Sequence, residues 1–185
     1  MSEPWGRIDR DGDQRRVHME HVYPCERDRL WGLVTDPAQL GRWFARVELL
    51  DGASEPPRVG ARYHIQFDDA DPSEHTTGSI LACAAPNSFT LSWTFPLEPL
   101  SQLRVELIPV PDGTRLVLDH YGLPRSQAVG YGAGWQAYLE QLAQVAGAHR
   151  QHQPCPTPLN ADWVARWRQL MPAYARGDKA LAADP

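Results

Sequence analysis

The chain has 185 residues, of which 42% are hydrophobic and 22% are charged, and its formal net charge is -5. These proportions are typical of a globular protein, and the length suffices for one domain of about 150 residues with an appendage. The negative charge argues against nucleic acid or an anionic membrane as the main partner, because both favour a basic protein face. No apolar run approaches the roughly 20 residues that span a bilayer.

The N-terminus and the cysteines indicate the cellular compartment. Residues 1–5 have no basic flank that leads into an apolar segment, so we expect no secretory signal. The cysteines, Cys25, Cys83 and Cys155, are odd in number and form no pair with metal-ligand spacing. We therefore expect free thiols in a reducing cytoplasm.

The first elements are a hairpin and a pair of helices. Residues 5–8 and 16–23 flank a turn and predict two paired strands. Residues 27–44 predict two short helices joined at a Thr-Asp-Pro sequence. There Asp36 can cap the second helix, and Pro37 suits its first turn because no backbone donor is needed at that position.

A run of strands follows, in which apolar and polar residues alternate. The pattern is strictest in residues 89–95, where Phe89, Leu91, Trp93 and Phe95 are separated by polar side chains. Further strands are predicted at residues 47–50, 63–67, 78–84, 103–107 and 116–120. Because short turns join these strands, we expect an antiparallel meander.

The C-terminal third predicts two helices. Ser126 is a candidate cap for a long helix with an apolar stripe that includes Trp135, Tyr138 and Leu142. Its glycines, Gly130, Gly132 and Gly134, predict a bend or a close backbone contact with the sheet.

A proline-rich linker, residues 151–158, precedes the last helix. We expect that helix to begin after Asn160, to carry an apolar stripe led by Trp163 and Trp167, and to end at Gly177. Packing back on the domain is the favoured interpretation of the stripe, with covering of a cavity mouth and docking on a second copy as alternatives. The chain thus divides into a domain, residues 1–150, and an appendage, residues 151–185.

Several short motifs, in this order and spacing, carry a resemblance to a known family. They are Leu30-Trp31, Thr35-Asp36-Pro37, Arg42-Trp43-Phe44, the segments 59–63, 78–81, 89–93 and 113–120, and Gly134-Trp135. The chain resembles the family of homologues of the activator of the 90-kDa heat-shock-protein ATPase, within the SRPBCC superfamily of START-like, polyketide-cyclase-like and birch-allergen-like proteins. The resemblance spans residues 5–149. It implies an α+β helix-grip fold, in which a curved antiparallel sheet surrounds a long C-terminal helix and encloses a cavity. The last helix lies outside the usual domain.

The ligand-binding residues follow from the inward face and this resemblance. The candidates are aromatic, because flat rings give a large contact area, and they are Tyr63, Phe67, Phe89, Trp93, Trp135 and Tyr138. The alternative is a filled core without a cavity. His120 continues the same face and is the candidate polar group, able to orient a ligand or to act as an acid or base. The alternative for His120 is a core histidine that is hydrogen-bonded to the backbone.

Other polar groups are weaker candidates. His21, Arg104 and Glu106 would add polarity to the site only if they faced inward, and strand charges more often face solvent. The acidic residues around 68–75 lack the spacing of a calcium loop, and His149, His152 and Cys155 straddle a helix end and the linker. The glycine-rich residues 130–134 lack the lysine of a phosphate-binding loop. We therefore expect no metal and no cofactor.

Three functions remain open. The leading hypothesis is a cytoplasmic protein that binds a small apolar molecule, lipid-like or polyketide-like, in an internal cavity. The first alternative is a protein-interaction module that regulates a chaperone, with a chaperone or a second copy of the chain as its partner. The second alternative is a cyclase-type or hydrolase-type enzyme that acts on a ligand held in the cavity, with His120 as the candidate catalytic residue.

Overall fold

The computed structural model describes residues 3–50, 58–147 and 161–183. The N-terminal elements are β1 (Gly6–Asp11), β2 (Gln14–Tyr23), α1 (Arg27–Thr35) and α2 (Pro37–Leu40). The central strands are β3 (Arg46–Leu49), β4 (Arg62–Gln66), β5 (His75–Ala84), β6 (Ser88–Trp93), β7 (Ser101–Val110) and β8 (Gly113–Leu123). The long helices are α3 (Arg125–Gly147) and α4 (Ala161–Ala183).

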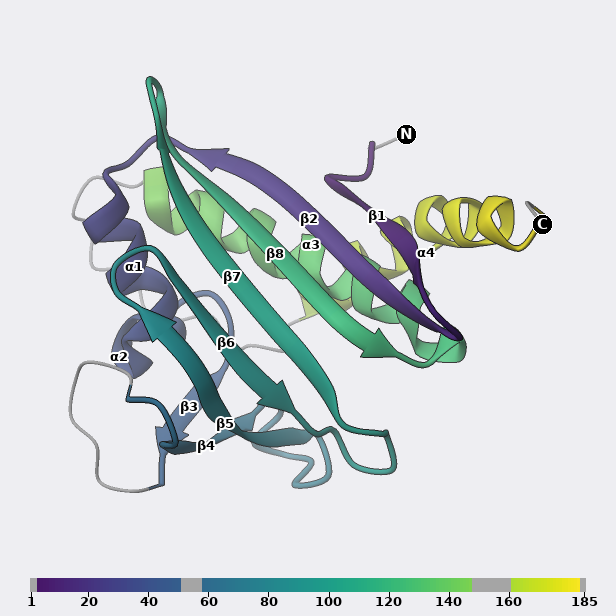
Figure 1. Cartoon of the computed structure of the whole chain (residues 1–185), viewed down its shortest axis with the longest axis horizontal. Coiled ribbons are helices and arrows are strands. Elements are labelled where there is room, and N and C mark those ends of the chain that lie inside the picture. Colours follow the sequence, from purple (N-terminus) through teal and green to yellow (C-terminus); the bar gives the residue numbers. More distant parts are fainter. Residues whose placement is uncertain (1–2, 51–57, 148–160, 184–185) are drawn as a thin grey trace.

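The strands form one antiparallel sheet in the order β1-β2-β8-β7-β6-β5-β4-β3. Consecutive strands from β3 to β8 are neighbours, so the predicted meander is confirmed, and the N-terminal hairpin extends the sheet by pairing β2 with β8. Figure 1 shows α3 crossing one face of the curved sheet, with α1 and α2 at one end. This arrangement is the expected α+β helix-grip fold.

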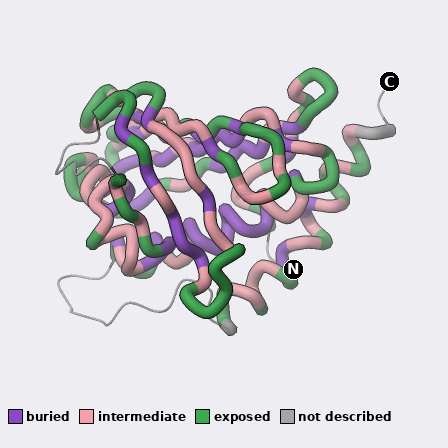
Figure 2. The backbone as a smooth tube through the Cα atoms, turned by 90° about the horizontal axis from the view of Figure 1, so that it is seen from below, coloured by how far each residue is buried: buried purple, intermediate pink, exposed green. Residues whose placement is uncertain are grey.

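The alternation in the sequence determines which face of each strand is buried. In β7, Ser101, Leu103, Val105 and Leu107 are buried, and the residues between them are more exposed. Side chains alternate between the two faces of a strand, so these four point to the same side as α3. Figure 2 shows the buried backbone concentrated in the strands and in the helix beneath them, and the exposed backbone in the turns.

The junction of α1 and α2 is built as its sequence predicts. The Asp36 carboxylate accepts a hydrogen bond from the backbone N–H of Ala38 at 2.9 Å, and Pro37 occupies the first turn of α2. Farther along, the Trp43 indole donates to the carbonyl of Leu33 at 2.8 Å, which holds the chain after α2 against α1. The helix pair is thereby fixed over one end of the sheet.

Two predictions for α3 are wrong. The helix begins at Arg125, so Ser126 lies inside its first turn and is not its cap. The glycines of α3 approach α4 and not the sheet: a Cβ atom at Gly132 would come within 2.7 Å of the Tyr174 ring, and one at Gly134 within 3.5 Å of the Trp163 ring. Small residues here allow the two helices to pack closely.

The last helix packs within the same molecule, against α3 and β1. Leu170 and Tyr174 are 1% and 2% exposed, which makes them part of the main core. The helix continues through Gly177 to Ala183, so the predicted end at Gly177 is wrong. Beyond that glycine, the Asp178 carboxylate accepts a hydrogen bond from the guanidinium of the buried Arg15 at 2.6 Å, and this tertiary contact holds the final turns in place. The predicted linker, with its cap Asn160, lies outside the described residues.

Candidate ligand-binding site

A cavity of about 330 Å³ lies between the inward face of the sheet and the helices α1, α2 and α3. The helix side of its wall includes Val34, Thr35, Leu40, Trp43 and Phe44 from the α1–α2 region, and Trp135 and Leu139 from α3. The sheet side includes Tyr63, Ile65, Ile80, Phe89, Leu91, Trp93, Leu103 and Leu118. We call this volume the apolar cavity, because nearly all of its wall is hydrocarbon.

The few polar side chains in this wall already have partners for their hydrogens. The Tyr63 hydroxyl donates to the carbonyl of Ser92 at 2.6 Å, and the Thr35 hydroxyl donates to the carbonyl of Trp31 at 2.7 Å. The three lining indoles also donate within the protein: Trp43 to a backbone carbonyl, Trp93 to the Tyr131 hydroxyl and Trp135 to His120. Among these described side chains, the hydroxyl oxygens of Tyr63 and Thr35 can still accept a hydrogen bond from a ligand.

The wall also carries no formal charge at neutral pH. Tyr63 is the one titratable side chain among the described residues that line the apolar cavity. Burial raises the pKa of its hydroxyl well above the ordinary value, so the phenol stays protonated. A charged ligand would therefore lose its hydration here and find no counter-charge.

His120 lines neither the apolar cavity nor the second cavity described below. It is fully buried, and its Nδ1 atom accepts a hydrogen bond from the Trp135 indole at 3.1 Å. An indole can only donate, so the proton of the neutral ring is on Nε2, which donates to the Ser101 hydroxyl at 2.9 Å. Burial lowers the pKa of His120 to about 3, so the ring is neutral at physiological pH. Its position suits it to orient the Trp135 ring.

A second cavity of about 520 Å³ is lined by two of these rings as well. Trp93 and Trp135 line both cavities, with their ring centroids 5.5 Å apart, and so form a shared wall. Phe67 and Tyr138 line the second cavity, and Tyr63 and Phe89 line the first. The predicted aromatic residues are thus divided between two neighbouring volumes. We call the second one the aromatic cavity.

Sequence reasoning did not assign several important residues to a site. Trp43 and Phe44 were noticed only as family motifs, although both line the apolar cavity. Glu74 and Glu98 line the aromatic cavity, and Tyr131 connects Glu98 to Trp93 by hydrogen bonds. Glu98 lies in the loop between β6 and β7, where the alternation that identifies inward residues is absent, so no periodic signal could have found it.

The weaker polar candidates lie away from both cavities. His21 stacks on Trp5, with ring centroids 3.7 Å apart, and burial lowers its pKa. Arg104 and Glu106 pair with each other between inward-facing residues of β7, and so lie on its outer face. No group of three potential metal-ligating side chains occurs within residues 3–50, 58–147 and 161–183. His149, His152 and Cys155 lie outside the described residues.

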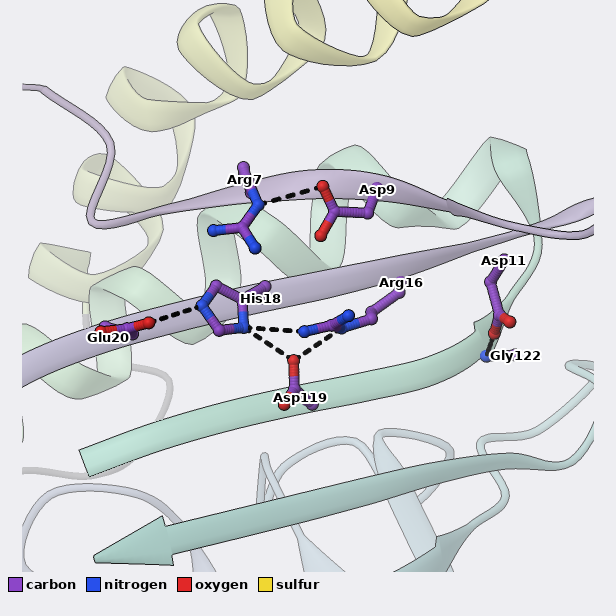
Figure 3. A network of polar contacts seen from close by, with 8 residues as sticks. All are labelled: Arg7, Asp9, Asp11, Arg16, His18, Glu20, Asp119 and Gly122. Carbon is purple, nitrogen blue, oxygen red and sulfur yellow. Dashed lines mark hydrogen bonds and ion pairs between the residues drawn. The ribbon is translucent and has the colours of Figure 1, made fainter. Parts of the chain in front are cut away.

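A polar network on the outer face of the sheet was also missed by sequence reasoning (Figure 3). One carboxylate oxygen of Asp119 on β8 accepts a hydrogen bond from the Arg16 guanidinium at 2.7 Å and lies 2.8 Å from the imidazole Nδ1 of His18. The other imidazole nitrogen lies 3.0 Å from Glu20. Arg16, His18 and Glu20 lie on β2, so the network ties β2 to β8 and contributes to neither cavity.

Residues 24–147 match the model of the family described as "Activator of Hsp90 ATPase homolog 1-like protein". The chain belongs to this family, and through it to the SRPBCC superfamily. No curated protein matches the sequence. The family segment contains the helix pair, most of the sheet and α3, whereas α4 lies beyond it.

Solved structures share the fold over nearly the whole chain. The crystal structure of CalU16 from Micromonospora echinospora is 22% identical, with a TM-score of 0.72 over 96% of this chain and 98% of that one. The protein EF2215 from Enterococcus faecalis is 17% identical, with a TM-score of 0.67 over 95% and 91% of the two chains. DynU16, from the dynemicin biosynthetic locus, is 25% identical over 72% of this chain and 47% of its own length, with a TM-score of 0.61. At 96% and 95% of this chain, the first two matches extend beyond the family segment, which ends at residue 147.

Within residues 3–50, 58–147 and 161–183, no helix is long and apolar enough to cross a bilayer.

Proposed function

We propose that this protein binds a small, neutral and mostly apolar molecule in the apolar cavity. The observation that carries the proposal is a partly open volume of about 330 Å³ whose wall is almost entirely hydrocarbon. Binding sites for small molecules commonly have volumes of about 300–1,000 Å³ and apolar walls with few polar groups. Burial of apolar surface, at about 25 cal/mol per Å², would supply the driving force.

The polar groups of the wall restrict the ligand further. Since the hydrogens of Tyr63 and Thr35 are already engaged, these hydroxyls offer oxygen atoms that can accept. A ligand with one or two hydroxyl or N–H groups suits the cavity better than one whose only polar group is a carbonyl. A lipid-like or polyketide-like molecule with a hydroxyl group meets these requirements. A cytoplasmic location is part of this proposal and fits the free thiols of Cys25 and Cys83.

A fluorescent probe tests the proposal directly. N-phenyl-1-naphthylamine is neutral, apolar and carries one N–H, and we expect it to bind with an increase in emission. Leu91 lines the cavity from β6, so Leu91→Trp should fill part of the volume and weaken probe binding at least tenfold. Leu81 on β5 is 43% exposed and lines neither cavity, so Leu81→Trp is the matched control and should bind as the natural protein does.

Two outcomes would contradict this function. One is the absence of probe binding to the natural protein. The other is equal weakening by Leu91→Trp and Leu81→Trp, which would place the bound probe outside the apolar cavity. Native mass spectrometry of protein purified from its own host would then identify the physiological ligand, and a co-purified compound should be neutral and largely hydrocarbon. The chaperone and homodimer partners considered from the sequence stay predictions.

A further inference from the structure

The aromatic cavity differs chemically from its neighbour. Its wall combines rings from β6 and the loop after it, from the segment after β4, from α3 and from α4. Tyr138 and Trp163 lie 5.0 Å apart, Trp163 and Trp167 are stacked at 6.2 Å, and Phe67 lies 6.5 Å from Tyr138. Together with Trp93 these rings line a partly open volume of about 520 Å³. The faces of such rings are electrically negative.

Two carboxylates face the same volume. Glu98 and Glu74 both line the aromatic cavity, and no arginine, lysine or histidine is among the described residues that line it. The Glu98 carboxylate is held in place, because it accepts a hydrogen bond from the Tyr131 hydroxyl at 2.7 Å, and that hydroxyl accepts one from the Trp93 indole at 3.1 Å. Burial, together with the nearby charges of Asp71 and Asp68, raises the pKa of Glu74. Negative charge is therefore concentrated at this cavity without a lining cation to balance it.

We propose that the aromatic cavity is a second binding site, which takes an organic cation such as a quaternary ammonium or a protonated amine. Aromatic faces attract a cation within about 6 Å, and the attraction is strongest for tryptophan and where water is excluded. The two carboxylates supply the counter-charge that the apolar cavity lacks. This site does not depend on the proposed apolar ligand, because Trp93 and Trp135 are the two residues that line both volumes and the other lining residues differ.

The last helix completes this site, which gives α4 a role beyond stability. Its contributions to the wall are the rings of Trp163 and Trp167 and the side chain of Val164. The Trp167 indole donates to the carbonyl of Gly130 at 3.0 Å, and the Arg166 guanidinium binds the Glu140 carboxylate through two hydrogen bonds of 2.6 Å. These contacts fix the register of α4 on α3, so the two rings are already positioned before a ligand enters.

Choline and its neutral carbon analogue 3,3-dimethylbutan-1-ol provide the test. The two molecules have nearly the same shape and differ in charge, so their affinities separate cation recognition from simple apolar burial. We expect calorimetric titration at constant ionic strength to show choline binding at least tenfold more tightly, which corresponds to about 1.4 kcal/mol. Equal affinities, or no binding of choline, would overturn the proposal.

Variants locate the site. Glu98→Gln keeps an acceptor for the Tyr131 hydroxyl but removes the charge, and we expect it to weaken choline binding at least fivefold. Trp163→Leu should do the same by removing a ring from the wall. Glu26→Gln is the matched control, because this exposed carboxylate lies before α1 and lines neither cavity, and it should leave the affinity unchanged.

The same variants separate this proposal from the proposed function. Binding of N-phenyl-1-naphthylamine should be unaltered in Glu98→Gln, because the substitution lies outside the apolar cavity. Choline affinity that is equally reduced by Glu98→Gln and Glu26→Gln would indicate a general effect of charge and would contradict a site at this cavity.

Discussion

Whether the apolar cavity is empty space can be tested on a single strand. Leu103 and Leu107 lie on the same face of β7, four residues apart, and are 4% and 2% exposed. Leu103 lines the cavity, whereas Leu107 is packed in the core and lines neither cavity. Substituting each leucine by phenylalanine therefore adds the same volume to two equally buried positions, one beside a void and one not.

The two substitutions should change the free energy of unfolding in opposite directions. Phenylalanine adds roughly 25 Å³ over leucine, and at about 24 cal/mol per Å³ of cavity removed, Leu103→Phe should stabilise the protein by about 0.6 kcal/mol. Leu107→Phe has no void to enter, so overpacking should cost about 1–3 kcal/mol. At about 2–4 °C per kcal/mol for a chain of this size, the two melting temperatures should differ by roughly 3–14 °C.

Scanning calorimetry or urea denaturation of the two variants and the natural protein measures this difference. The melting temperature of the natural protein should lie between those of the two variants, and close to that of Leu103→Phe. Equal destabilisation by both substitutions would refute the reasoning, because it would mean that the space beside Leu103 is already filled. Loss of the folded state in Leu107→Phe with a stable Leu103→Phe agrees with the expectation.

Two further predictions concern the core and the packing of α4. His120 has a folded-state pKa of about 3 against an ordinary 6.5, so acid favours the unfolded state, and the free energy of unfolding should fall by about 1.6 kcal/mol from pH 6.5 to pH 5. Denaturation of His120→Gln should show a smaller loss over that interval, and an equal loss would contradict this. On α3, Gly130→Ala should stabilise by up to about 1 kcal/mol because a Cβ there meets no atom closer than 4.0 Å. Gly132→Ala should destabilise by about 1–3 kcal/mol because its Cβ would clash with Tyr174; equal melting temperatures for the two alanine variants would disprove the close contact.

Much of the fold could be predicted because it depends on local patterns. Alternation in residues 89–95 and 103–107 identified two central strands and their buried faces, and the Asp36-Pro37 pair identified the start of α2. Gly177 shows where local signals fail. A glycine there favours the end of a helix, but the contact between Arg15 and Asp178, 163 residues apart, carries α4 past it.

The candidate site was predictable as a set of rings and not as two volumes. Periodicity places Phe67 and Trp93 on inward faces, but it does not show on which side of the Trp93–Trp135 wall each ring lies. It also places His120 inward without showing that Trp135 stands between it and the apolar cavity. These relations depend on the curvature of the sheet and on how α3 crosses it, and no short stretch of sequence encodes either.

By itself, the sequence determined the order of the elements and the faces that they bury, because hydrophobic period and turn chemistry act over a few residues. Only the tertiary structure decided that the buried faces leave space between them, that this space is divided by two indole rings, and that Glu74 and Glu98 meet the rings of α4 in one of its parts. The physical reason is that a cavity is the difference between the volume that the packed elements enclose and the volume that their side chains fill. That difference arises from residues far apart in the chain.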